Sequence, residues 1–245
     1  NPFFVIVLVA SAVRGDDVHA ATVPGTVASA VLARAQRVGA DARKVLETAS
    51  LAPGSMELAM INVLAGEAAS EGIDECVDAG LLRWHGRGLA FRHELARRAV
   101  EGAISEMRRR GKHTEVYERL RRDSPDAVDR MAYHAQEARD AAAVLATAPK
   151  AAMLAAKLGA HREAAAHYKM ALQYAQGLTL DARADLLERW AFESMVIGDA
   201  SDAVMAARQE ALALRKTLGQ RPQIGMNLRW LARLHRSRLQ TTEAE

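Results

Sequence analysis

The sequence predicts a mainly α-helical protein in which a winged-helix domain is followed by an α-solenoid of stacked helix pairs. Half of the 245 residues are apolar, only 4% are aromatic and only 6 are proline. This composition suits closely packed helices, because alanine and other small apolar residues have high helix propensity. A change of hydrophobic period near residue 91 predicts the winged helix, and self-similarity at a fixed offset after residue 158 predicts the solenoid.

A β-hairpin is expected in the middle of the first domain. Two short apolar runs, at residues 81–84 and 89–91, flank the tetrapeptide His85-Gly86-Arg87-Gly88. Two glycines in four residues allow the positive φ that a tight reversal needs. The period then changes from 2 to 3.6, and apolar residues mark one face of a helix: Leu95, Ala96, Ala99, Val100 and Ala103. Helices before a hairpin and one after it outline a winged helix.

The helices before the hairpin follow from apolar periodicity and from capping residues. They are expected at residues 26–37, 41–51, 56–64 and 71–79. Ser55 is expected to cap the third of them, and Gly80 to end the fourth. An apolar run at residues 3–13 is too short to span a bilayer and lacks a preceding basic segment, so we expect a buried helix there.

After the winged helix every segment has helical character. A long polar helix is expected at residues 104–122, and Ser124 with Pro125 is expected to start the next one. Further helices are expected at 126–138 and 140–158, the second interrupted near Pro149.

The remaining segments repeat. Residues 158–164 are echoed by residues 197–203, and Trp190 is echoed by Trp230. The expected helices are 150–158 with 161–175, 182–197 with 201–218, and 224–238. Self-similarity at this period predicts an α-solenoid. Because a solenoid does not end on an exposed apolar face, we expect the chain to be a fragment of a longer polypeptide.

Five segments together resemble the large LuxR-type transcriptional regulators of actinobacteria, which are signal-transduction ATPases of the STAND class. Residues 1–4 resemble the end of their Gly-x-Pro element, residues 23–34 the start of their winged helix, and residues 91–95 their MHD segment. Residues 133–138 and 158–172 resemble their tetratricopeptide-like sensor region. The resemblance implies three parts: the tail of an upstream ATPase region (1–20), a winged-helix domain (21–105) and tetratricopeptide-like repeats (106–245).

The same resemblance implies a nucleotide switch in the parent protein. Its MHD histidine, here His93, approaches the β-phosphate of ADP, and Pro2 packs against the adenine. Arg92 and Glu94 depart from the methionine and aspartate of that motif. The chain contains no Gly-x4-Gly-Lys-Ser/Thr sequence, so it is not expected to be an enzyme or to hold a cofactor itself. The implied partners are its own upstream ATPase domain, an inducer or protein on the repeats, and DNA only through a missing C-terminal domain.

Two further sets of residues are candidate binding surfaces. Aromatic residues of the repeats could line a ligand groove or pack between helices: Tyr168, Tyr174, Trp190 and Trp230. A basic patch could contact phosphates or an acidic partner, although interleaved carboxylates favour a salt-bridged face: Arg108, Arg109, Arg110 and Lys112. A zinc site is not expected, because Arg97 stands where the His93-Glu94 pair would need a second histidine.

These observations favour a cytoplasmic regulatory or sensor fragment of a STAND-type transcriptional regulator. The lone Cys76 excludes an intramolecular disulfide, no membrane segment is visible, and a net charge of +3 is too small to indicate nucleic-acid binding. The alternatives are a freestanding helical-repeat adaptor and a winged-helix DNA-binding protein with a helical sensor. The expected helix at 56–64 has no arginine or lysine, which disfavours DNA recognition.

Overall fold

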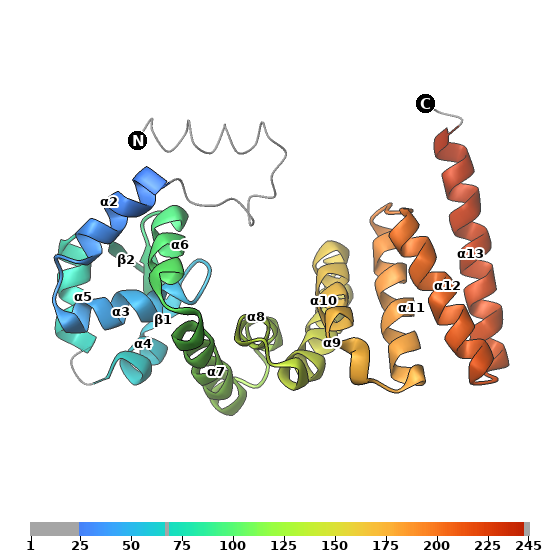
Figure 1. The fold of residues 1–245 in the computed structure, drawn as a ribbon, viewed down its shortest axis with the longest axis horizontal. Coiled ribbons are helices and arrows are strands. Elements are labelled where there is room, and N and C mark those ends of the chain that lie inside the picture. The colour runs from blue at the N-terminus through green and yellow to red at the C-terminus, as the bar shows by residue number, and fades with distance from the viewer. Residues whose placement is uncertain (1–24, 67–68, 243–245) are drawn as a thin grey trace. The chain divides into compact units, whose positions relative to one another are not determined.

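The computed structural model describes residues 25–66 and 69–242 (Figure 1). In this part the chain is mainly α-helical, with twelve α-helices and one small β-sheet. It divides into two compact units, Asn1–Val116 and Tyr117–Glu245, called here the N-terminal and C-terminal units. The expected helix at 3–13 and the predicted site residue Pro2 lie outside the described residues.

The N-terminal unit contains the predicted helices and the predicted hairpin. Its elements are α2 (Gly25–Ala35), α3 (Ala40–Ser50), β1 (Met56–Glu57), α4 (Leu58–Ala65), α5 (Ala69–Asp78), β2 (Leu82–His85), β3 (Gly88–Phe91) and α6 (Glu94–Ala103). The helix α7 (Glu106–Asp123) follows, and the division between the two units falls inside it. The sequence placed the domain boundary after residue 105, just before this helix.

The sheet is antiparallel, with the strand order β1-β3-β2. Gly86, at a φ of 55°, forms the reversal between β2 and β3. Glu57 pairs with Gly88, where the two backbones approach closely. A Cβ atom added to Gly88 would lie 2.9 Å from Glu57 Cα and nearer still to the carbonyl oxygen of Met56. Only glycine fits this position of β3 without displacing β1.

The prediction of a helix beginning at Met56 behind a Ser55 cap is wrong. Met56 and Glu57 form the strand β1, and α4 begins at Leu58 with Glu57 as its N-cap residue. The Met56 side chain is fully buried. Its strand conformation depends on pairing with Leu89, which is distant in the sequence and therefore leaves no local signal.

The core of the N-terminal unit joins three helices and the sheet. Its fully buried side chains include Val45 and Leu46 of α3, Ile61 of α4, Cys76 of α5 and Leu89 of β3. Cys76 donates a hydrogen bond from its thiol to the carbonyl oxygen of Ala42, 3.2 Å away. Cys76 is therefore a small residue of the core.

Cys76 is expected to be chemically inert in the folded protein. Burial, assisted by the nearby charge of Glu75, raises the pKa of the thiol to about 12. Thiolate is the reactive form, so both burial and protonation protect the sulfur. Treatment with Ellman's reagent near pH 8 should therefore give no thiol release from the native protein and one equivalent after unfolding in guanidinium chloride. Rapid stoichiometric reaction of the native protein would contradict this burial.

Arg97 ties α6 to the end of α3. Its side chain is buried and donates hydrogen bonds to the backbone carbonyl of Ser50 and to the carboxylates of Glu94 and Glu101. The Glu101 contact is 2.8 Å long, and His113 lies 3.5 Å from the same carboxylate. Arg97, which stands where a His-Glu-x-x-His zinc motif would need its second histidine, is thus a buried cation with a structural role.

The C-terminal unit is a row of helices, each packed against the next in the chain (Figure 1). They are α8 (Val128–Ala138), α9 (Ala141–Lys157), α10 (His161–Gln173), α11 (Leu180–Val196), α12 (Asp202–Thr217) and α13 (Arg221–Thr242), with the 3-10 turn η1 (Ala175–Gly177) after α10. The expected break at Pro149 is wrong, since α9 continues through it. Ser124 does not cap α8 either, because that helix begins only at Val128.

The similar segments at residues 158–164 and 197–203 both begin at the C-cap residue of a helix, and the two helix ends have the same geometry. Gly159 after α9 and Gly198 after α11 both have left-handed backbones, with φ of 77° and 84°. In each case the next N–H reaches back to a carbonyl five residues earlier, from Ala160 to Ala155 and from Asp199 to Ser194. This pair of features defines the Schellman motif, which closes a helix and lets the chain reverse.

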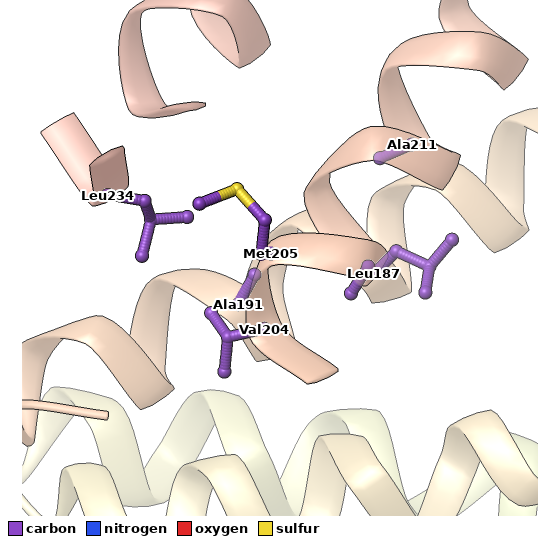
Figure 2. Close-up of a cluster of buried hydrophobic side chains, with 7 residues drawn as sticks. Leu187, Ala191, Val204, Met205, Ala211 and Leu234 are labelled. Carbon is purple, nitrogen blue, oxygen red and sulfur yellow. The ribbon is translucent and has the colours of Figure 1, made fainter. Parts of the chain in front are cut away.

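A hydrophobic cluster holds α11, α12 and α13 together. Figure 2 shows Met205 of α12 reaching toward Leu234 of α13, with Ala191 of α11 and Val204 of α12 beside it. These four side chains are at most 5% exposed. The small alanines let the helices approach closely, which fixes the relative positions of the side chains on the neighbouring face of the same three helices.

Candidate ligand groove

A groove of about 600 Å³ lies on α10, α11, α12 and α13, entirely within the C-terminal unit. Its apolar lining residues are Tyr168, Phe192, Pro222, Met226 and Trp230. Its polar lining residues are Glu188, Arg189, Glu193, Arg208 and Gln223. Apolar surface with a few convergent polar groups is the usual composition of small-molecule sites, which have volumes of roughly 300–1,000 Å³.

Aromatic and apolar side chains form the accessible wall of the groove. The rings of Phe192 and Trp230 meet edge to face, with their centroids 5.4 Å apart. Phe192 is 38% exposed and Met226 is 49% exposed. The guanidinium groups of Arg208 and Arg233 lie 5.6 and 5.4 Å from the centre of the Trp230 ring, within the range of cation–π attraction. The indole is thereby fixed in place between α12 and α13.

Arg215, next to the groove, is the centre of an ion network that joins α12 to α11. Its buried guanidinium donates to Asp181 at 2.7 Å, to Glu188 at 2.8 Å, and to Asp185. Gln220 also contacts both Arg215 and Asp181. These hydrogen bonds raise the pKa of Arg215 above its ordinary value, so the side chain is always charged.

Glu188 is the acidic residue through which this network reaches the groove. Its carboxylate accepts hydrogen bonds from Arg215 and, at 2.5 Å, from the side-chain amide of Asn227. Burial raises the pKa of Glu188, but the hydrogen bonds from Arg215 and Asn227 outweigh burial and hold it below its ordinary value. Glu188 is therefore ionised at neutral pH.

Acidification is expected to destabilise the C-terminal unit through Glu188. A lowered carboxylate pKa contributes stability above the unfolded-state pKa, about 4.3, and this contribution is lost as the pH falls through the folded-state pKa. We expect thermal stability to fall with pH in this acidic range and to fall less steeply in a Glu188→Gln variant. Calorimetric scans between about pH 3 and pH 7 would check this, and parallel profiles for the two proteins would contradict it.

Arg208 lies at the base of the groove and is only 3% exposed. It donates to the side-chain oxygen of Asn227 at 3.1 Å and to the backbone carbonyl of Glu188 at 2.9 Å. Both acceptors are formally neutral groups. Burial lowers the pKa of Arg208, and the Glu188 charge opposes this.

The second acidic residue of the groove is Glu193. Its buried carboxylate lies 2.7 Å from Nδ1 of His161, a half-buried residue at the start of α10. The contact connects α10 to α11. Both carboxylates of the groove thus have a partner that is not itself a lining residue.

The structure separates the four aromatic residues predicted as a ligand face. Tyr168 and Trp230 line the groove. Trp190 packs instead against the hydrophobic cluster of α11–α13, and Tyr174 is the C-cap residue of α10 and does not line the groove. Trp190 thus packs between helices and does not line the groove.

His93, the predicted phosphate-sensing residue, is exposed at the N-cap of α6, two residues after β3 ends at Phe91. Its backbone is extended, and its carbonyl accepts hydrogen bonds from the N–H groups of Ala96 and Arg97. This is the hairpin–helix junction at which the sequence placed it.

The predicted basic patch lies on α7 and is largely paired with carboxylates. Arg108 and Lys112 both contact Glu47 of α3, at 3.0 and 3.5 Å, and Arg110 contacts Glu106 at 2.7 Å. Arg109, the fourth member of the predicted set, is half-buried. The alternative of a salt-bridged face fits these contacts better than a free basic surface does.

Comparisons with protein-family models, with curated proteins and with solved structures gave no significant match to this chain. Among the helices that the structure describes, none combines the length and apolar character needed to cross a membrane.

Proposed function

We propose that the chain is the regulatory part of a STAND-class transcriptional regulator of the LuxR type. Tetratricopeptide-like repeats in the C-terminal unit would bind an inducer, and a winged helix in the N-terminal unit would keep an ATPase switch closed. The observation that carries the sensor role is the 600 Å³ groove, in which aromatic and charged side chains from four consecutive helices converge.

The arrangement of the N-terminal unit supports the winged helix. A helix, a short strand, two helices and a hairpin follow one another as α3, β1, α4, α5, β2 and β3. The first strand adds to the far side of the hairpin, which produces the order β1-β3-β2. The β2–β3 hairpin would be the wing, and His93 lies two residues after its end at Phe91.

The composition of α5 argues against a DNA-binding role for this unit. This helix precedes the wing, the position from which a winged helix reads the major groove. It carries four carboxylates, on Glu71, Asp74, Glu75 and Asp78, and no arginine or lysine. Such a face would repel the phosphate backbone, so we propose protein contact as the role of the unit.

The groove can act as a sensor by a shift of populations. An inducer changes the switch only as far as it binds one arrangement of the parent protein more tightly than the other. In the proposed closed state His93 contacts ADP on the ATPase domain. Nucleotide released from the denatured full-length protein should therefore be ADP, and a His93→Ala version should retain less of it.

A neutral fluorescent probe tests whether the groove binds apolar ligands. We expect N-phenyl-1-naphthylamine to bind the 245-residue chain with saturable fluorescence enhancement. Met226→Glu should abolish this binding, because it places a charge on the apolar wall. Leu228→Glu is the matched control, since Leu228 lies on the same helix and is 51% exposed but does not line the groove. Equal loss in both variants, or no binding at all, would contradict the groove's role.

A further inference from the structure

The charged groups that line the groove are compensated unequally. Glu188 is paired with Arg215, and Glu193 is paired with His161. Arg208 and Arg189, in contrast, have no carboxylate within ion-pair distance among the residues that the structure describes. Among the described residues, the groove therefore has two carboxylates that are each paired with a residue outside the lining, and two arginines that form no salt bridge, although the charge of Glu188 acts on Arg208 from a greater distance.

Arg208 also has a buried donor that is not used. Its two terminal nitrogens bond to Asn227 and to the backbone of Glu188, but Nε is buried and has no hydrogen-bond partner in the described structure. Buried polar groups are nearly always satisfied, so an unpaired donor on a 3%-exposed side chain calls for an explanation. An acceptor supplied by a ligand would provide one.

We propose that Arg208 is an anion subsite and that the ligand of the groove is a small organic acid, a carboxylate joined to an aromatic or aliphatic body. The proposal rests on the groove being a ligand site. Arginine donates charge-assisted hydrogen bonds to carboxylates, and these are stronger than bonds to neutral acceptors. The exposed side chains of Phe192 and Met226 would cover the apolar body.

The size and lining of the groove favour a small acid over a peptide. A volume of about 600 Å³ lies within the range of small-molecule pockets. The anion subsite and the apolar wall come from the same three helices, since Phe192 lies on α11, Arg208 on α12 and Met226 on α13. All three residues also line the same groove, so a single short molecule can reach both.

The test compares an acid with its neutral isostere. Displacement of N-phenyl-1-naphthylamine from the full chain is measured with 4-phenylbutyrate and with 4-phenylbutyramide, which share the same ring and chain length. We expect the acid to bind at least about tenfold more tightly, as one charge-assisted bond to a buried arginine predicts. The Nε–H resonance of Arg208 should shift with the acid and not with the amide.

Two variants test whether the preference for the acid over the amide depends on Arg208. Arg208→Met should reduce the preference for the acid to less than about twofold, the level left by uniform apolar binding. Arg233→Met is the matched control, because Arg233 also stacks on Trp230 but is exposed and does not line the groove, and it should keep the preference. The acid–amide comparison in the unaltered protein remains decisive if Arg208→Met does not fold.

The outcomes separate the two proposals. Equal affinity for acid and amide, or a preference that survives Arg208→Met, would overturn the anion subsite and leave the groove as a site for neutral ligands. Failure of the fluorescent probe itself to bind would overturn both. Displacement by the acidic peptide Ac-Phe-Glu-NH2, together with no displacement by 4-phenylbutyrate, would overturn the small acid in favour of a peptide partner.

Discussion

Replacing Arg215 with methionine is expected to lower the free energy of unfolding of the C-terminal unit by about 3 kcal/mol. The guanidinium is 3% exposed and is the shared partner of Asp181, Asp185 and Glu188. Its loss leaves Glu188, whose side chain is 19% exposed, as a poorly solvated charge without its main partner. Breaking a buried ion pair costs about 3–5 kcal/mol. We expect a loss near the lower end of this range, because Asp181 and Asp185 are about half exposed and water can solvate them once Arg215 is gone.

Arg121→Met is the matched control for this prediction. Arg121 makes the same kind of contact with Glu118, at 2.6 Å, but its side chain is 65% exposed. Exposed pairs contribute about 1 kcal/mol or less, so the control should remain near the stability of the unaltered protein. Urea unfolding followed by far-UV circular dichroism measures both. Similar losses in the two variants would show that burial does not determine the strength of the Arg215 network.

The helical part of the fold could be predicted because its signals are local. Apolar periodicity, turn residues and the two glycines around Arg87 each act within a few positions of the element they specify. The predicted reversals at Gly80 and Gly86 are present, and both residues have positive φ. The repeated Leu-Gly and Ile-Gly ends at residues 158 and 197 likewise correspond to repeated helix ends.

The features that the sequence did not reveal depend on distant partners. The sequence around Met56 predicts an apolar helix, but Met56 lies in the strand β1 because it pairs with Leu89 of β3. Pro149 reads as a helix breaker, yet α9 packs against α8 on one side and α10 on the other, and these contacts keep the helix continuous. Tertiary packing overrides local preference at both positions.

The groove could be predicted only in part, for a related reason. Aromatic residues are conspicuous in a chain that has few, so the sequence singles out four of them as candidates, and two of these, Tyr168 and Trp230, line the groove. Arg208 is one of many arginines, and nothing near it in the sequence distinguishes it from exposed ones. Its importance comes from burial and from an unpaired Nε, which only the three-dimensional packing of α11, α12 and α13 creates.

The second large effect is expected in the N-terminal unit, where Gly88→Ala should lower the free energy of unfolding by at least about 3 kcal/mol. The new Cβ atom would lie 2.8 Å from the carbonyl carbon of Met56 and 2.9 Å from Glu57 Cα. These are backbone atoms of β1, so no side-chain rotation relieves the clash. Either β1 separates from β3, exposing the buried Met56, or the sheet distorts throughout.

Gly102→Ala provides the contrast, because Gly102 lies in α6 and an added Cβ would meet no atom of the described residues within 4 Å, apart from its chain neighbours and the nearby backbone of its own helix. Alanine is the better helix former, so this variant should be more stable by about 0.5–1 kcal/mol. Replacing glycine with alanine is thus expected to lower the free energy of unfolding at Gly88 and to raise it at Gly102. Urea unfolding gives the free energies, and hydrogen exchange of the amides at 56–57 and 88–91 reports the pairing of β1. If Gly88→Ala left both unchanged, the close approach of β1 and β3 would be wrong, and with it the three-stranded sheet on which the winged-helix proposal rests.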